Sequence, residues 1–144
     1  MQIETSEQTI FNAVTYRVET PDGIMYVIIM ESSEGKPIGM HISIGKAGAP
    51  LAAWATSLAR MISLAFEMRI SVNDIIHELS NMTSDRRRTD SLGIAVRSGP
   101  DGVCTALIKY RGDNYHKMME ANGHKQQRDE DDRPPWMAGR TAAP

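Results

Sequence analysis

The run Ile24–Met30 constrains the fold most, because it is apolar at every position yet far too short to cross a membrane. Such a run is typical of a central strand. The turn signal Thr20–Gly23 precedes it, and the polar segment Ser32–Lys36 follows it. Apolar and polar residues mix over 11–18 and alternate over 38–44, as in half-buried strands. We therefore expect three antiparallel strands in a meander.

Two helices are predicted after the strands. Pro50 suits the first turn of a helix, where its missing N–H has no partner to lose. Ser71 and Asp74 have the spacing of a capping box and predict a second, shorter helix. The first helix carries apolar residues at three- and four-residue steps, and we expect this face to pack on the sheet: Leu51, Trp54, Ala55, Leu58, Met61, Ile62 and Ala65.

The end of the predicted core allows two readings. Polar residues over 83–91 predict a solvated loop, and Leu92–Val96 fits a short strand. Residues 99–110 fit either a helix opened by Pro100 or a strand after a hairpin turn. The fold class is therefore α+β: a small antiparallel sheet of three to four strands, with a long helix and one or two shorter helices on one face.

A chain of 144 residues with 41% apolar residues has room for one core. We expect a flexible arm over 1–10, a folded domain over 11–111 and a disordered polar tail over 112–144. Sixteen Lys and Arg against eighteen Asp and Glu exclude a uniformly basic nucleic-acid coat. No apolar run reaches the length of a membrane span, so we expect a cytoplasmic protein without membrane contact.

Cysteine and histidine usage argues against metal chemistry. The single Cys104 supplies neither an intrachain disulfide nor a cysteine-rich zinc site. The four histidines are dispersed and show no ligand spacing. We expect no metal, no cofactor and no catalytic residue.

Gly45, Lys46, Ala47 and Gly48 lead into the first helix. Backbone N–H groups at a helix N-terminus bind phosphate or other anions, and Lys46 would add a positive charge. The segment lacks the spacing of a P-loop. In the other reading, the two glycines only shape a tight turn between strand and helix.

Arg86, Arg87 and Arg88 form the strongest local cluster of positive charge, to which Lys46 and Arg97 are candidate additions. Three adjacent guanidinium groups suit a nucleic-acid backbone. A solvated loop is the alternative, because Asp85 and Asp90 lie close to the cluster and offset its charge. No aromatic residue is interleaved for base stacking.

The first helix has more apolar surface than one sheet face requires, because Leu64 and Phe66 widen its apolar arc. A partner helix or a second subunit is therefore expected, and a homo-oligomer is the simplest form of this. Trp54 is an interface candidate with Leu64 and Phe66, since large aromatics anchor interfaces. Trp54 fits the core equally well.

Several segments in this order resemble a known family. They are the loop Ile44–Gly48, the helix with Ala59–Ala65, and Ile75–Leu79. The chain resembles, from Tyr16 to Tyr110, the C-terminal domain of vitamin B12-dependent (class II) ribonucleotide reductases, known as the TSCPD domain. Ser98–Asp101 stands where the family signature reads Ser-Cys-Pro-Asp, and this favours the helix reading there.

The departures from the family pattern concern sulfur. The resemblance places the family's cysteines at positions that here hold Pro21–Gly23, Ala49–Pro50, Met82–Thr83 and Gly99. The resemblance therefore implies that the chain has the fold of the family and a link to deoxyribonucleotide or DNA metabolism. It does not imply the family's thiol or zinc chemistry. A reductase barrel does not fit in this length of chain.

The function expected from this reading is that of a non-catalytic accessory protein. Its partner would be a ribonucleotide reductase, a replication protein, or a phosphate-bearing ligand such as a nucleotide. One alternative is a nucleic-acid-binding accessory protein that uses the arginine loop. A structural homo-oligomer is the other.

Overall fold

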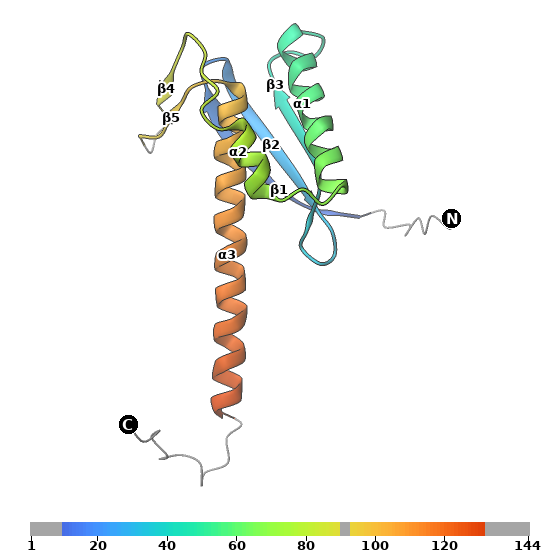
Figure 1. The fold of residues 1–144 in the computed structure, drawn as a ribbon, viewed down its shortest axis with the longest axis vertical. Helices are drawn as coiled ribbons and strands as arrows, with labels where there is room; N and C mark the ends of the chain where they lie inside the picture. The colour runs from blue at the N-terminus through green and yellow to red at the C-terminus, as the bar shows by residue number, and fades with distance from the viewer. Residues whose placement is uncertain (1–9, 90–92, 132–144) are drawn as a thin grey trace, which may run out of the picture. The chain divides into compact units, whose positions relative to one another are not determined.

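The computed structural model describes residues 10–89 and 93–131, with side chains up to residue 120 (Figure 1). The chain divides into two compact units, Met1–Lys109 and Tyr110–Pro144. The first unit holds the sheets, two helices and the beginning of a third. The second unit holds the rest of that third helix.

Three strands form the main sheet, in the order β1-β2-β3. They are β1 (Asn12–Thr20), β2 (Gly23–Glu31) and β3 (Pro37–Ile44), and both pairings are antiparallel. The predicted meander and the α+β class are confirmed. Thr20 pairs with Gly23 across a two-residue turn, and Gly23 has a φ of 122° that favours glycine.

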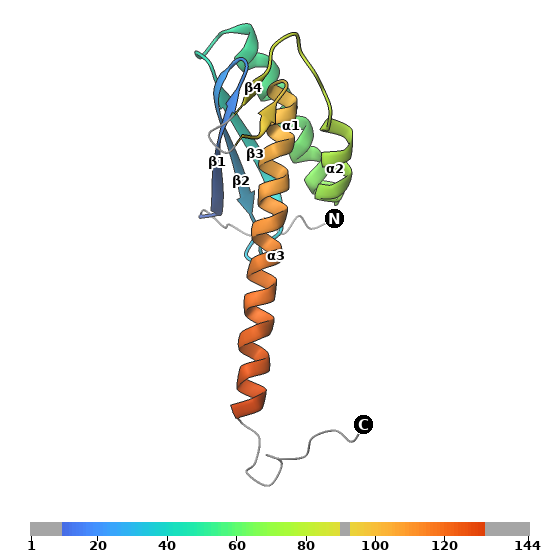
Figure 2. The same ribbon diagram turned by 90° about the vertical axis from the view of Figure 1, so that its left-hand side faces the viewer.

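One face of the sheet forms the core. Met25 faces Ile44 and Val27 faces Ile42 across the β2–β3 pairing, and these four side chains are at most 5% exposed. Figure 2 shows the strands as one layer with the helices on one side of it. The opposite face is more open, since Tyr26 is 42% exposed.

Helix α1 (Pro50–Glu67) begins at the predicted proline. Its buried face differs from the predicted one, because Trp54 is 77% and Met61 63% exposed. The buried residues of the helix are Ala55, Ala59, Ile62 and Phe66. Small side chains at 55 and 59 let the helix approach β3 closely, so the bulkier part of the apolar arc turns outward.

Ser63 fixes α1 to the outer edge of β3. Its Oγ accepts a hydrogen bond from the Met40 N–H (2.9 Å) and lies within donating distance of the Met40 carbonyl oxygen (3.2 Å). The same hydroxyl lies 2.8 Å from the Ala59 carbonyl oxygen. The N–H of Met40 at this edge is therefore satisfied by a helix side chain, and its carbonyl oxygen shares the single hydroxyl proton with that of Ala59.

Helix α2 (Val72–Leu79) starts as its capping pattern predicts. The Asp74 N–H donates to Ser71 Oγ at 3.1 Å. Before it, α1 ends in a Schellman motif: the Arg69 N–H donates to the Phe66 carbonyl and the Ile70 N–H to the Ala65 carbonyl. Arg69 adopts a φ of 58° in this motif.

Two short strands follow, β4 (Arg88–Thr89) and β5 (Ala95–Val96), and they pair with each other rather than with the main sheet. The expected fourth strand therefore belongs to a separate sheet. Part of the expected loop is β4, since Thr89 pairs with Ala95. Residues 90–92 lie outside the described residues.

Helix α3 (Gly99–Asp131) settles the choice over 99–110 in favour of the helix. Val103, Ala106 and Leu107 are at most 1% exposed. At Gly102, an added Cβ would lie 2.9 Å from Met25 Cε. The first turns of α3 therefore cross the sheet at a distance that only a glycine permits.

The chain after residue 111 differs from the predicted disordered tail, because α3 continues to Asp131. Lys, Glu, Gln and Met, which favour helices, each occur twice over 112–131, and proline is absent from this stretch. The expected arm over 1–10 and the end of the tail, 132–144, fall outside the described residues except for Ile10. In the described ranges, no helix has both the length and the apolarity of a membrane span.

Candidate binding pocket

A pocket of about 370 Å³ opens at one end of the main sheet. The turn between β1 and β2, the end of β3, the first turns of α1 and the start of α3 enclose it. Its lining residues are Asp22, Met25, Ile42, Ile44, Leu51, Trp54, Ala55, Leu58, Gly99, Pro100 and Val103. Asp22 is the one charged residue among them.

The floor and the rim of this pocket differ in exposure. Met25 and Val103 are each 1% exposed and form the floor together with the end of β3. Trp54, at 77% exposed, stands at the rim on α1. An apolar floor with an exposed indole beside it suits an apolar side chain of a ligand or partner better than a phosphate.

Two of the four positions where the family resemblance places cysteines line this pocket, through Asp22 and Gly99. A Cβ at Gly99 would be 3.9 Å from Asp22 Oδ2, so the first-hairpin position and the signature position meet. Ser98 Oγ donates to the Met82 carbonyl oxygen at 2.5 Å. The position after the second helix, Met82–Thr83, therefore lies close to Gly99. The remaining position of a family cysteine, Ala49–Pro50, directly precedes the pocket residue Leu51.

None of these positions holds a cysteine. Cys104 is buried, and its Sγ lies 3.7 Å from the Ile76 carbonyl oxygen. Within the part of the chain that the structure describes, no three His, Cys, Asp or Glu residues gather as a metal site. The pocket offers apolar contact and one carboxylate.

The segment Gly45–Gly48 is exposed and connects β3 to α1. Gly45 has a φ of 68° and Gly48 a φ of 83°, and the Ala49 N–H donates to the Lys46 carbonyl oxygen at 3.1 Å. Both glycines are therefore needed for the turn itself. The N-terminus of α1 has neither a side-chain cap nor an acidic residue in its first turn. Phosphate binding here stays a prediction.

The arginine loop is exposed at Arg86, Arg87 and Arg88. Arg88 Nη2 lies 3.9 Å from Glu19 Oε1. Arg97 has a structural role, because its Nη1 donates to Asn81 Oδ1 at 3.1 Å and its N–H donates to a carboxylate at the start of α3.

The predicted basic residues do not form one surface. In Figure 1 the connection from β3 to α1, which contains Lys46, and strand β4 lie on opposite sides of the start of α3. The charge of the arginine loop is therefore separate from that of Lys46.

The three interface candidates divide in the structure. Trp54 is 77% and Leu64 49% exposed, so both are accessible on α1. Phe66 is 6% exposed and belongs to the core, which corrects its prediction as an interface residue. Phe66 follows Ala55 by eleven residues, which is about three helical turns, so both residues lie on the buried side of α1.

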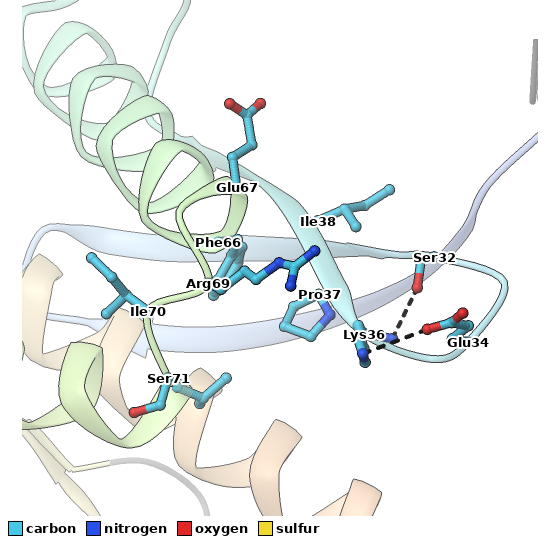
Figure 3. Close-up of a pocket in the computed structure, with 11 residues that line it drawn as sticks. Ser32, Glu34, Lys36, Pro37, Ile38, Phe66, Glu67, Arg69, Ile70 and Ser71 are labelled. Atoms are coloured by element: carbon cyan, nitrogen blue, oxygen red, sulfur yellow. Dashed lines mark hydrogen bonds and ion pairs between the residues drawn. The ribbon is translucent and has the colours of Figure 1, made fainter. Parts of the chain in front are cut away.

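A second pocket, of about 560 Å³, lies between the β2–β3 loop and the end of α1 (Figure 3). No pattern in the sequence predicted this pocket. Arg69 extends from the end of α1 toward Pro37 and Ile38. Lys36 lies 3.5 Å from Glu34. Glu67 also lines the pocket, so two positive charges are balanced by two negative ones and the pocket has no marked preference for an anion.

Taken together, the fold is a two-layer α+β domain with an apolar pocket where four chain segments converge. The family model of the TSCPD domain matches residues 4–111. The chain belongs to the TSCPD domain family. Neither a curated protein nor a solved structure matches it.

Proposed function

We propose that this chain is a non-catalytic accessory protein of deoxyribonucleotide or DNA metabolism, and that its pocket holds an apolar side chain of a protein partner. The observation that carries the proposal is that Asp22 and Gly99 line one apolar pocket, and that a hydrogen bond from Ser98 holds Met82 beside Gly99. The family places cysteines at these positions, according to the resemblance. Because these positions lie together but hold no cysteine, we infer that the chain keeps the family's binding geometry without its thiol chemistry.

The lining supports a protein partner over a phosphate. Burying one Leu or Phe side chain contributes about 1.5–3 kcal/mol, and the floor of Met25 and Val103 matches such a group. Phosphate requires several N–H donors or cations, whereas this pocket holds the carboxylate of Asp22. The expected partner is a B12-dependent ribonucleotide reductase, since the domain resembles a segment of that enzyme class.

The test is calorimetric titration of the full chain against a purified B12-dependent ribonucleotide reductase of the same organism. A pocket-filling variant, Gly99→Leu, is expected to weaken binding at least about tenfold, which corresponds to about 1.4 kcal/mol. Gly99 has no positive φ, and its added Cβ meets only Asp22 within 4 Å, so the fold should tolerate the change.

Gly112→Leu is the matched control. It also changes a glycine of α3 into leucine, at a position where an added Cβ meets nothing within 4 Å. It should leave the affinity unchanged. The proposal fails if the reductase does not bind the chain, or if both variants bind it equally.

Nucleotide binding at Lys46 is the alternative ligand. A nucleotide at one hundred times its Kd would stabilise the fold by about 2.7 kcal/mol. Such a shift in Tm, lost in Lys46→Gln and kept in Gly99→Leu, would favour the phosphate site over the pocket. The exposure of Lys46 beside an uncapped helix N-terminus supports keeping this alternative.

Nucleic-acid binding is the second candidate function, and the consecutive exposed Arg86, Arg87 and Arg88 favour it. Affinity for DNA should then fall steeply as salt rises, because bound phosphates release counterions. Replacing the three arginines with glutamine should abolish a mobility shift seen at low salt. A structural homo-oligomer, the third possibility, would show fixed stoichiometry and respond to none of these ligands.

A further inference from the structure

The outer face of α1 carries large apolar residues that nothing in the described chain covers. Trp54, Met61, Leu64 and Met68 are 77%, 63%, 49% and 70% exposed. We call these four residues the α1 outer stripe. The other side of the helix is buried at Ala55, Ala59, Ile62 and Phe66, so α1 is apolar on two faces. A contiguous exposed apolar surface of this kind marks an interaction site.

The stripe has the spacing of a helix-pairing seam. Trp54, Met61 and Met68 follow one another at seven-residue intervals, and Ser57 and Leu64 lie between them, also seven residues apart. Alternating steps of three and four residues keep side chains on one side of a helix that faces another helix. The seam extends from Trp54, in the second turn of α1, to Met68, directly after its last residue.

We propose that a second copy of this chain covers the α1 outer stripe, with the two α1 helices antiparallel about a two-fold axis at Met61. In this arrangement Trp54 of one copy lies level with Met68 of the other, and Ser57 lies within one residue of the level of Leu64. Each large residue therefore meets a smaller or a flexible one, and a methionine sulfur meets an indole. A parallel pairing would place Trp54 against Trp54 and leave a gap between two copies of Ser57.

The charge of the helix argues for this occupant over a membrane surface. Arg60 and Glu67 are the charged residues of α1, and they cancel each other. Helices that lie on membranes have polar faces rich in Lys and Arg. The stripe itself is uncharged, so two copies meet without repulsion.

The surface goes beyond the proposed function and is experimentally separable from it. Trp54 lines the candidate pocket, but Met61, Leu64 and Met68 do not. A stripe of this size predicts a weak and reversible dimer, because stable interfaces bury about 1,200–2,000 Å² in total and one aromatic side chain contributes about 150–250 Å².

The test is sedimentation equilibrium of the full chain over a concentration series. We expect a monomer–dimer equilibrium whose dissociation constant rises at least about tenfold in Met61→Lys, since the two-fold axis brings two lysines together. Met118→Lys is the matched control, because Met118 is 64% exposed on α3. It should leave the equilibrium unchanged. Circular dichroism checks that both variants keep their helices.

Cysteine cross-linking tests the orientation. Under mild oxidation, Met61→Cys should form a disulfide between copies, because the axis passes through this position. Leu64→Cys should not, since antiparallel helices separate the two copies of residue 64 along the helix axis. A chain that stays monomeric, a dimer unaffected by Met61→Lys, or a disulfide in Leu64→Cys would each overturn the proposal. Vesicle binding that Met61→Lys abolishes, without dimers in solution, would also overturn it in favour of a membrane surface.

Discussion

Arg69 holds the left-handed conformation that ends α1, with a φ of 58°. This position of a Schellman motif is usually glycine, because a Cβ crowds the backbone there. Asn81 has a φ of 62° at the end of α2, but asparagine tolerates this region better than arginine. The chain therefore keeps an arginine where a glycine would relieve strain.

Replacing Arg69 with glycine should stabilise the fold by about 1 kcal/mol, since the strain of a non-glycine residue in this region is removed. The midpoint of urea unfolding, with an unchanged slope, would show it. Asn81→Gly is the comparison and should give a smaller gain. A loss of stability in Arg69→Gly would mean that contacts of the arginine side chain outweigh its backbone strain.

Single residues of this kind separate what sequence could predict from what it could not. Ser71 was predictable as a cap, because its side-chain chemistry and its spacing to Asp74 define the motif locally. Arg69 was not, because nothing in its side chain indicates a left-handed backbone. Ser63 likewise reads as an ordinary helix serine, and its role depends on a strand 23 residues away.

At the scale of elements, α1 and β3 form a pair joined through one hydroxyl. Ser63→Ala should destabilise the fold by about 1–3 kcal/mol, because it leaves the N–H and carbonyl of Met40 without this partner. Chemical denaturation measures the loss.

Ser57→Ala is the control for this change. Ser57 Oγ also donates within α1, to the Ala53 carbonyl oxygen at 3.0 Å, but it is exposed and reaches no strand. Its replacement should change stability by no more than about 0.5 kcal/mol. Equal effects of the two substitutions would show that the contact with β3 contributes nothing.

The crossing of α3 over the sheet depends on Gly102. A Cβ there would meet Thr20 Cγ2 at 3.0 Å and Val18 Cγ1 at 3.3 Å. Both side chains are β-branched and buried, so they have little freedom to move. Gly102→Ala should therefore cost about 1–2 kcal/mol in spite of the better helix propensity of alanine.

Gly112→Ala provides the opposite expectation on the same helix. An added Cβ meets nothing within 4 Å there, so the propensity gain of about 0.5–1 kcal/mol should appear as increased stability. Thermal unfolding of both variants gives the comparison. A stabilising effect of Gly102→Ala would contradict the prediction, because α3 would then have to move away from the sheet without loss of stability.

The elements themselves were largely predictable. Strand alternation, the turn at Gly23 and the proline at the start of α1 are local signals, and each was confirmed. The buried face of α1 was not predictable, because an apolar arc wide enough for two surfaces does not indicate which part faces the sheet. The continuation of α3 was missed because its polar composition suits both a disordered tail and a helix.

At the scale of the whole molecule, the two units differ in the support their helical residues have. Buried side chains such as Ala106 and Leu107 belong to the first unit. In the second unit, Tyr115, Met118 and Met119 are more than half exposed. A helix without a buried face is only marginally stable in water.

Hydrogen exchange should reflect this difference. We expect amides of 103–107 to open with a free energy close to that of global unfolding, and amides of 115–120 to open with a free energy near zero. Mass spectrometry of peptides from the two regions measures both. Slow exchange over 115–120 would mean that this part of α3 is covered in solution.

The candidate pocket shows the limit of sequence reasoning for a whole site. The resemblance identified the four positions where the family places cysteines, but the meeting of two of them, Asp22 and Gly99, in one cavity depends on the packing of α1 and α3 against the sheet. No sequence pattern separates Met25 and Val103, which form the apolar floor, from ordinary core residues. Only the three-dimensional structure distinguishes these two roles.

The bond of Ser63 to the outer edge of β3 also determines in which direction the sheet can grow. A strand from another polypeptide adds to a sheet by pairing with free main-chain donors and acceptors, and those of Met40 are already engaged. Edge-on polymerisation at β3 would first have to detach a helix of the same chain. One hydroxyl group thus blocks the addition of a further strand at Met40, near the middle of this edge.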